Sequence, residues 1–282
     1  MKQIVVISGK GGTGKTVLTA SFASLAKNKV MADCDVDAAD LHLLLQPEIK
    51  ERHEFRSGVT ATIDKELCQA CGECISVCRF NAISGDFTID PISCEGCTIC
   101  SYVCPVGAIK LEENLSGEWF VSETKYGPFV HAKLGIAEEN SGKLVSVVRQ
   151  KAKEIAEKEN LDYVIIDGPP GIGCPVIASL ANVDLAMIVT EPTLSGIHDM
   201  ERVALVSKHF KVTTKVVINK FDINQENTEE IKKICQKENI EVVAQLPFSQ
   251  KVSESIVQGV PLVEFCSNGI VREVSSLWER IK

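Results

Sequence analysis

The segment Gly9-Lys10-Gly11-Gly12-Thr13-Gly14-Lys15-Thr16 lies between an apolar run, Ile4–Ser8, and a stretch with helical character, Lys15–Lys27. It matches the pattern G-x4-G-K-[ST] and has the context that this phosphate-binding motif requires, a strand before it and a helix after it. Its glycines allow backbone N–H groups to turn inward around phosphates, and the start of the helix adds the positive end of a dipole. A glycine-rich turn without a ligand is the alternative, and the agreement between motif and context disfavours it.

The same motif assigns chemistry to individual residues. We expect the Lys15 ammonium to reach the β- and γ-phosphates of ATP, and the Thr16 hydroxyl to bind Mg²⁺. The residues of the motif that we expect to bind ATP or ADP are Gly11, Gly12, Thr13, Gly14, Lys15 and Thr16.

Outside the motif, short apolar runs alternate with helical patterns. The runs that we interpret as buried strands are Val30–Asp33, Tyr163–Asp167, Leu185–Thr190, Lys215–Asn219 and Val242–Leu246. This alternation predicts an α/β fold of the P-loop NTPase type, with a mostly parallel sheet covered by helices on both faces. Ligands of such sheets bind beyond the carboxyl ends of the strands, so polar residues that follow these runs are candidates for the site.

Composition excludes several classes of function. The formal net charge of −8 argues against binding to a nucleic-acid backbone, and an aromatic content of 5% does not suggest a base-stacking surface. No apolar run approaches the roughly 20 residues of a membrane span. The first residues show no secretory pattern, so we expect a cytoplasmic protein with no membrane span and no nucleic-acid partner.

Residues 60–112 hold eight of the twelve cysteines. The sequence CQACGECISVCRFNAIS, which begins at Cys68, is repeated 26 residues later as CEGCTICSYVCPVGAIK, which begins at Cys94. A tandem duplication of one small unit explains this offset. Each copy has the C-x2-C-x2-C-x3-C spacing of bacterial ferredoxins that carry two [4Fe–4S] clusters. The segment interrupts the α/β pattern, so we expect an inserted α+β ferredoxin module at 60–111 in a P-loop domain formed by 1–50 and 112–282.

In this spacing the fourth cysteine of each copy binds the cluster of the other copy. The ligands predicted for cluster 1 are Cys68, Cys71, Cys74 and Cys104, and those for cluster 2 are Cys94, Cys97, Cys100 and Cys78. Two zinc sites are the alternative, but zinc does not need two identical runs of four cysteines. Cys78 is followed by Arg79 where the second copy has Pro105, and since that proline is not a ligand the cluster is still expected.

The sequence KGGTGKT, which begins at Lys10, resembles the deviant Walker A motif of the MinD, Mrp and nitrogenase iron-protein group of ATPases. Further similarity to this group lies in Asp33-Cys34-Asp35, Asp167-Gly168-Pro169-Pro170-Gly171, Asn219-Lys220 and Pro247-Phe248. The resemblance implies that Lys10 reaches the nucleotide of a second subunit across a homodimer formed with ATP. It also implies that Asp35 orients the attacking water and that Asp167 holds Mg²⁺ through water. Asn219 would read adenine, and Pro247 and Phe248 would flank the base.

Together the two modules predict Mg²⁺-dependent ATP hydrolysis coupled to electron transfer through two [4Fe–4S] clusters to a redox or metallocluster partner protein. An ATPase that assembles or carries iron–sulfur clusters or metal cofactors is the alternative. A role in positioning cell division is disfavoured, because the apolar C-terminal stripe from Val271 to Ile281 has few basic neighbours and is expected to pack on the domain. Cys174, which follows the Asp167 motif, is a candidate for a cluster ligand shared between subunits.

Overall fold

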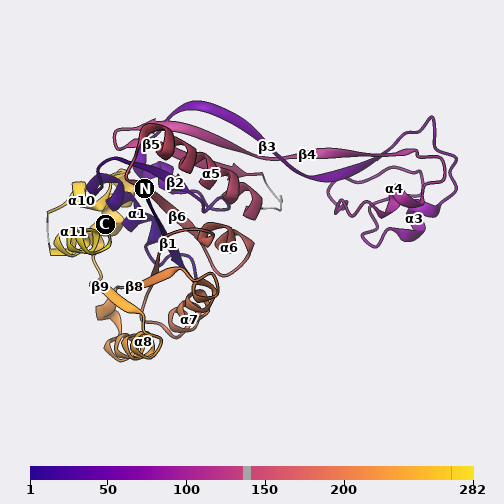
Figure 1. The fold of residues 1–282 in the computed structure, drawn as a ribbon. Helices are drawn as coiled ribbons and strands as arrows, with labels where there is room; N and C mark the ends of the chain where they lie inside the picture. Colours follow the sequence, from indigo (N-terminus) through magenta and orange to yellow (C-terminus); the bar gives the residue numbers. More distant parts are fainter. Residues whose placement is uncertain (136–140, 268) are drawn as a thin grey trace. The chain divides into compact units, whose positions relative to one another are not determined.

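A computed structural model describes residues 1–135, 141–267 and 269–282. Its nine strands form one sheet in the order β3-β4-β5-β2-β6-β1-β7-β8-β9 (Figure 1). The strands are β1 (Lys2–Ser8), β2 (Lys29–Asp33), β3 (Glu48–Ile63), β4 (Ile109–Thr124), β5 (Gly127–Leu134), β6 (Tyr163–Pro170), β7 (Leu185–Thr190), β8 (Thr213–Asn219) and β9 (Glu241–Leu246). The neighbouring strands from β5 to β9 in this order pair in parallel, which confirms the α/β fold with a mostly parallel sheet.

Helices cover both faces of the parallel part of the sheet, which explains why its strands are continuous apolar runs and do not alternate. Within the described residues the helical elements are α1 (Lys15–Leu25), α2 (Leu41–Leu45), α3 (Glu73–Val77), α4 (Ile99–Val103), α5 (Ser141–Glu159), α6 (Cys174–Leu180), α7 (Leu194–His209), η1 (Phe221–Ile223), α8 (Gln225–Lys237), α9 (Gln250–Gln258), α10 (Leu262–Phe265) and α11 (Gly269–Ile281). Helices α1, α2 and α11 pack on one face of the sheet, where they share one hydrophobic core with residues of the strands. Helices α5, α6 and α7 form the other helical layer and also contact the strands.

The C-terminal helix α11 packs on the domain, as its apolar stripe predicted. Val274, Leu277 and Ile281 are buried in the same core as α1. The rings of Trp278 and Phe22 lie 5.4 Å apart between centroids. Within the described residues, none of the helices combines the length and the apolar character needed to cross a membrane.

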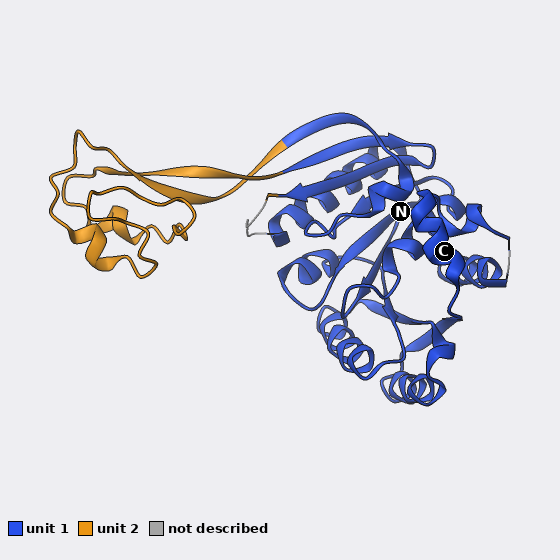
Figure 2. Ribbon diagram, turned by 180° about the vertical axis from the view of Figure 1, so that it is seen from behind, with its two compact units in different colours: residues 1–53, 118–134, 141–282 blue, residues 54–117, 135–140 orange. Residues whose placement is uncertain are grey.

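The chain divides into two compact units, coloured separately in Figure 2. Unit 1 comprises Met1–His53, Glu118–Leu134 and Ser141–Lys282, and unit 2 comprises Glu54–Gly117 with Gly135. Strands β3 and β4 are paired neighbours, and each passes from one unit into the other. Neither strand is among the apolar runs identified in the sequence, because charged residues dominate the region where they pair, and there Arg52 makes two hydrogen bonds of 2.7 and 2.6 Å to the Glu118 carboxylate.

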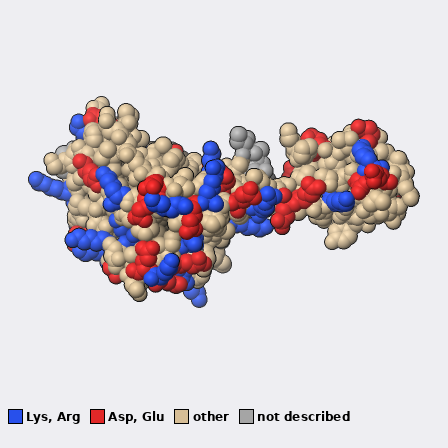
Figure 3. Space-filling view, turned by 90° about the horizontal axis from the view of Figure 1, so that it is seen from above, with Lys and Arg blue, Asp and Glu red and all other residues tan. Residues whose placement is uncertain are grey.

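Unit 2 is built on a small core of Ala61, Cys74, Ile83 and Ile109, against which eight further partly buried cysteine and apolar side chains pack. Its two helices, α3 and α4, have five residues each. In unit 1, the leucine-rich stretch from Ala38 to Leu45 has a helical pattern in the sequence, whereas α2 begins only at Leu41. On the face of the molecule in Figure 3, basic and acidic side chains are interspersed.

Candidate nucleotide site and cysteine cavities

The loop between β1 and α1 turns back on itself at two glycines with positive φ, Gly12 at 78° and Gly14 at 95°. A Cβ atom at Gly14 would lie 2.6 Å from Asn219 Nδ2, so both the backbone angle and the space require glycine there. Lys15 begins α1 directly after this turn and is 5% exposed. The loop therefore places its backbone and Lys15 at the start of a helix, where an anion is favoured.

A cavity of about 440 Å³ opens beside this loop at the carboxyl edge of the sheet. The residues predicted from the sequence that line it are Gly11, Gly12, Gly14, Lys15, Thr16, Asp35, Asn219, Pro247 and Phe248. Thr13 is buried, and neither it nor Lys10 nor Asp167 is part of the lining. The lining also includes Pro170 and Lys220, which belong to motifs quoted above but were given no role, and Ser249 and Val252, which no motif marks.

Asp35 faces Lys15 across the cavity, with 3.8 Å between Asp35 Oδ2 and Lys15 Nζ. Burial raises the pKa of Asp35 to about 6, against the opposing effect of the Lys15 charge. Asp33 is fully buried and accepts hydrogen bonds from the backbone N–H groups of Asp35 (3.1 Å) and Leu41 (3.2 Å). Asp33 thus fixes the loop that presents Asp35 and joins it to the start of α2.

Asp167 lies in the buried part of β6, where it pairs in register with Asp33 of β2. Its Oδ1 accepts a hydrogen bond of 3.0 Å from Thr19 Oγ1, whereas its buried Oδ2 has no hydrogen-bond partner among the described residues. Burial raises the pKa of Asp167, and Lys15 and hydrogen bonds from Thr16 and Thr19 oppose this shift. A buried carboxylate oxygen without a partner beside a P-loop threonine fits Mg²⁺, which prefers oxygen ligands.

Lys10 points to the loop between β7 and α7 of its own chain. Its Nζ lies 2.6 Å from Glu191 Oε1 and donates hydrogen bonds to Thr193 Oγ1 (3.2 Å) and Ser195 Oγ (3.1 Å). The second oxygen of Glu191, Oε2, lies 3.1 Å from Lys220 Nζ. One carboxylate with 14% side-chain exposure therefore holds a lysine from the P-loop and a lysine from the lining of the cavity.

The residues at the ends of β8 and β9 connect the P-loop to the far side of the cavity. Asn219 Nδ2 donates a hydrogen bond of 2.8 Å to the Thr13 carbonyl, and its Oδ1 accepts one of 3.0 Å from the Lys220 N–H. Phe248 is 55% exposed at the cavity, and its backbone N–H donates to Asp222 Oδ1 at 2.7 Å. The aromatic ring is thus free to contact a flat ligand, while Asn219 already braces the phosphate loop.

The eight cysteines of unit 2 line two separate cavities. The first cysteine cavity is lined by Cys68, Cys71, Cys74 and Cys104, together with apolar residues such as Ile63, Phe87 and Ile109. The second cysteine cavity is lined by Cys78, Cys94, Cys97 and Cys100, together with Ala61, Phe80, Ile83 and Ile99. Each cavity therefore gathers three cysteines of one repeat and the fourth cysteine of the other.

These two sets of thiols differ from a site for a single ion. Among the described residues, no group of three or more His, Cys, Asp or Glu side chains is placed to hold one metal ion. A [4Fe–4S] cluster takes one thiolate at each of four irons, so its ligands surround a volume and do not converge on one point. The donor set of four thiols around a small apolar cavity fits this requirement. Cys174 lies exposed at the start of α6, in unit 1, and contributes to neither cavity.

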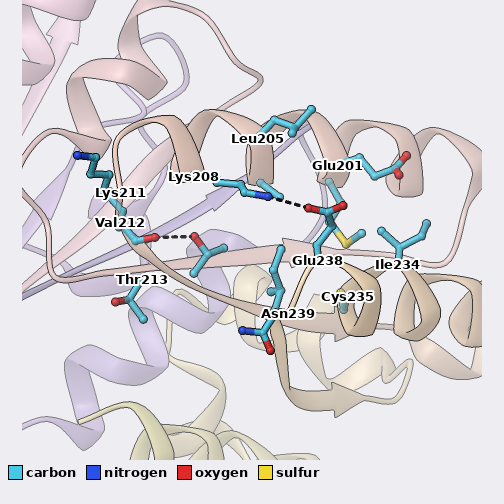
Figure 4. Close-up of a pocket in the computed structure, with 14 residues that line it drawn as sticks. Glu201, Leu205, Lys208, Lys211, Val212, Thr213, Ile234, Cys235, Glu238 and Asn239 are labelled. Carbon is cyan, nitrogen blue, oxygen red and sulfur yellow. Dashed lines mark hydrogen bonds and ion pairs between the residues drawn. The ribbon is translucent and has the colours of Figure 1, made fainter.

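A further cavity of about 420 Å³ lies between α7 and α8, against the first residues of β8 (Figure 4). An ion pair of 3.1 Å between Lys208 and Glu238 joins the two helices there. The apolar residues that line this cavity include Met200, Ala204 and Ile234. Since β8 begins at this cavity and ends at Asn219, the cavity lies at the opposite end of that strand from the candidate nucleotide site.

Comparison with known proteins agrees with this architecture. Residues 4–262 match the family model described as the CobQ/CobB/MinD/ParA nucleotide binding domain. The chain is 35% identical to an uncharacterized protein of Methanocaldococcus jannaschii over 99% of this chain and 96% of the relative. It is 27% identical to an iron–sulfur cluster carrier protein of Pyrococcus horikoshii over 43% of this chain and 45% of the relative. The septum site-determining protein MinD of Pyrococcus horikoshii, solved with Mg-ADP, has the same fold, with a TM-score of 0.60, 16% identity and coverage of 100% and 96%.

Proposed function

The chain belongs to the CobQ/CobB/MinD/ParA family of nucleotide-binding domains, and we propose that it hydrolyses ATP and couples hydrolysis to electron transfer through two [4Fe–4S] clusters. The observation that carries the ATPase part is the meeting of Lys15, Asp35 and Asp167 at one edge of the sheet. Phosphoryl transfer requires a cation for the phosphates and carboxylates for the metal and the attacking water. These are the buried Lys15, the Asp35 carboxylate 3.8 Å from it, and the Asp167 carboxylate with one oxygen that has no partner among the described residues.

In this proposal the backbone of Gly11–Gly14 and the Lys15 ammonium bind the phosphates, and Thr16 and Asp167 hold Mg²⁺. When bound, Mg²⁺ neutralises charge on the β- and γ-phosphate oxygens. Asp35, ionised at neutral pH because its pKa is about 6, accepts a hydrogen bond from the attacking water and orients it. Catalysis then consists of positioning and charge stabilisation, with little covalent chemistry on the protein.

The base of the nucleotide would lie toward Asn219, Pro247 and Phe248. The Phe248 ring offers a flat apolar surface to adenine. Because one amide N–H of Asn219 is already given to the Thr13 carbonyl, adenine recognition uses its second N–H or replaces that bond. Either arrangement joins recognition of the base to the conformation of the phosphate loop.

Lys10 would act on the nucleotide of a second subunit in an ATP-bound homodimer. Two nucleotides with several negative charges would otherwise repel each other across such an interface. In the described conformation Lys10 has three acceptors within its own chain, of which the Glu191 carboxylate is the closest. Lys10 must therefore leave Glu191 before it reaches a partner's phosphates, and Glu191 sets the free-energy cost of that step.

Residues 60–111 would act as the electron-transfer module. The first cysteine cavity would hold cluster 1, and the second cysteine cavity would hold cluster 2. Two clusters that exchange fourth ligands form a short chain for electron hopping toward a redox or metallocluster partner. The alternative, an ATPase that assembles or carries clusters, is supported by the partial similarity to an iron–sulfur cluster carrier protein. Transfer of iron and sulfide from the purified protein to an apo-ferredoxin would favour that alternative.

Two measurements test the proposal. Anaerobically purified protein should contain about eight irons and eight sulfides per chain, as two cubanes require, and stoichiometric zinc with little iron would contradict the clusters. Lys15→Ala should abolish tight ATP binding, because it removes the charge that faces the phosphates. Asp35→Asn should retain binding and lose phosphate release. An Asp35→Asn variant that hydrolyses ATP at the wild-type rate would remove Asp35 from the mechanism.

A further inference from the structure

The two copies of the repeat in unit 2 have diverged at one helix face. Helix α3 follows Cys71 in the first copy, and helix α4 follows Cys97 in the second. The 26-residue offset makes Glu73 equivalent to Ile99, and Ser76 equivalent to Tyr102. Since residues three apart lie on the same side of a helix, each pair forms one face, which is polar in α3 and apolar in α4.

The apolar pair is open to solvent. Ile99 is 48% exposed and Tyr102 is 83% exposed. Phe80, which is 44% exposed, lines the second cysteine cavity together with Ile99 and the exposed Cys97. We call Phe80, Ile99 and Tyr102 the apolar face; it lies beside the proposed ligands of cluster 2.

The first copy shows that this helix forms without apolar side chains at the positions of Ile99 and Tyr102. Helix α3 has the same length as α4 and the same place behind its cysteine loop, and it forms with Glu73 and Ser76 at the equivalent positions. Large apolar groups grouped on a surface favour contact with another molecule over contact with water. Ile99 and Tyr102, which complete the apolar face beside Phe80 of the first copy, are thus features of the second copy that folding of the helix does not require.

The same cysteine loop is covered by β3 at Gly96. A Cβ atom at Gly96 would lie 2.2 Å from the carbonyl oxygen of Val59, so β3 packs directly on the loop there. An approach to cluster 2 from that side would have to displace a strand. The apolar face marks the side that a second protein can reach.

We propose that the apolar face is the docking surface for a basic electron-transfer protein that exchanges electrons with cluster 2. The inference rests on the proposed function, since it requires that cluster 2 forms. Charge selects the kind of partner, because residues 54–117 include nine acidic side chains and only four basic ones. A partner with an apolar centre and a rim of lysines or arginines complements this unit, and tyrosine is one of the residue types that most often anchor such contacts.

The test uses the full chain with its clusters and oxidised cytochrome c, a small basic electron acceptor, as the probe. Binding is measured by titration calorimetry, so the readout is affinity and not turnover. The double variant Ile99→Gln with Tyr102→Ser keeps the charge and should weaken binding roughly 10-fold or more. The matched control, Glu73→Asp with Ser76→Thr on helix α3, should bind like the wild type.

Three outcomes would overturn the proposal. They are a wild-type chain that carries its clusters but does not bind cytochrome c, a double variant that binds within about twofold of the wild type, and a control that loses affinity equally. Sedimentation of the wild type and the double variant without nucleotide reveals a different occupant. If the wild type is a dimer and the double variant is a monomer, the partner is a second copy of this chain, and the proposal of a redox protein is refuted. Iron analysis of each sample separates these results from failure of the proposed function, in which the clusters are absent.

Discussion

Replacing Glu191 with glutamine isolates the contact that holds Lys10 within its own chain. Glu191 and Lys10 have side-chain exposures of 14% and 29%, and their charged atoms lie 2.6 Å apart. The substitution removes the charge and retains the shape, so Thr193 and Ser195 can still accept hydrogen bonds from Lys10. If Lys10 acts on the nucleotide of a second subunit, the variant should form the ATP-bound dimer more readily.

The magnitude follows from the burial of the pair. Fully exposed ion pairs contribute about 0.2–1 kcal/mol, and hydrogen bonds to charged groups contribute about 1.5–3 kcal/mol. The Lys10–Glu191 pair is partly buried, and Glu191 keeps Lys220 as a partner when Lys10 leaves. Its contribution therefore falls between these values, at about 1–2 kcal/mol per subunit. Two lysines are released in each dimer, so the free energy of dimerisation should improve by about 2–4 kcal/mol, or roughly 30- to 800-fold.

Sedimentation equilibrium with a non-hydrolysable ATP analogue measures this change. Glu238→Gln is the control, because it makes the same substitution and breaks an ion pair of 3.1 Å with Lys208 that is more exposed and lies away from the candidate nucleotide site. Lys10→Ala should leave ATP binding to the monomer largely intact and weaken the dimer, and Glu191→Gln should then have no further effect in that background. A Glu191→Gln variant that dimerises at the wild-type concentration, or less readily, would refute the argument that Glu191 restrains Lys10.

Two further predictions concern the pH dependence of hydrolysis and the connection between the modules. Because burial raises the pKa of Asp35 to about 6, the carboxyl group is protonated below that pH. The rate of single-turnover phosphate release should therefore fall about tenfold per pH unit below 6. A rate that stays flat from pH 7 to about pH 5 would exclude Asp35 as the group that orients water. An ATP analogue and ADP should shift the reduction potentials of the clusters by different amounts, which redox titration monitored by electron paramagnetic resonance measures. By linkage, the oxidation state of the clusters should change nucleotide affinity by the same factor, typically about 5–150-fold. Identical potentials and identical nucleotide affinities would indicate a passive insert.

The parallel strands were predictable because strands buried on both faces are continuous apolar runs. Leu185–Thr190 has the predicted bounds, and β6 and β8 differ from their predicted bounds only at the ends. The residues that line the candidate nucleotide cavity were predictable for a related reason, since parallel strands bring their carboxyl ends to one edge of the sheet. Asp35 and Asn219, far apart in the sequence, meet there.

The rest depends on contacts that leave no periodic signal. Residues 48–56 are mostly charged, and they form a strand because β4 pairs with them and because pairs such as Arg52 and Glu118 match across the two strands. Glu191 belongs to no recognised motif, and only the fold brings it between Lys10 and Lys220. The boundary of α2 was missed because Asp33 accepts a hydrogen bond from the Leu41 N–H and so fixes where the helix begins.

The path of the chain gives a physical basis for communication between the modules that requires no contact between them. Asp33 joins the loop of Asp35 to the first residue of α2, and α2 ends at the buried Leu45. Only Gln46 and Pro47 separate α2 from β3, which continues without a break to Ile63 in the lining of the first cysteine cavity. Proline fixes its own φ, and the Gln46 side chain donates a hydrogen bond of 2.9 Å to the Gly259 carbonyl, so this link is not a flexible tether. We therefore expect a change at Asp35 during the proposed hydrolysis of ATP to be passed to β3, which ends at the lining of the first cysteine cavity.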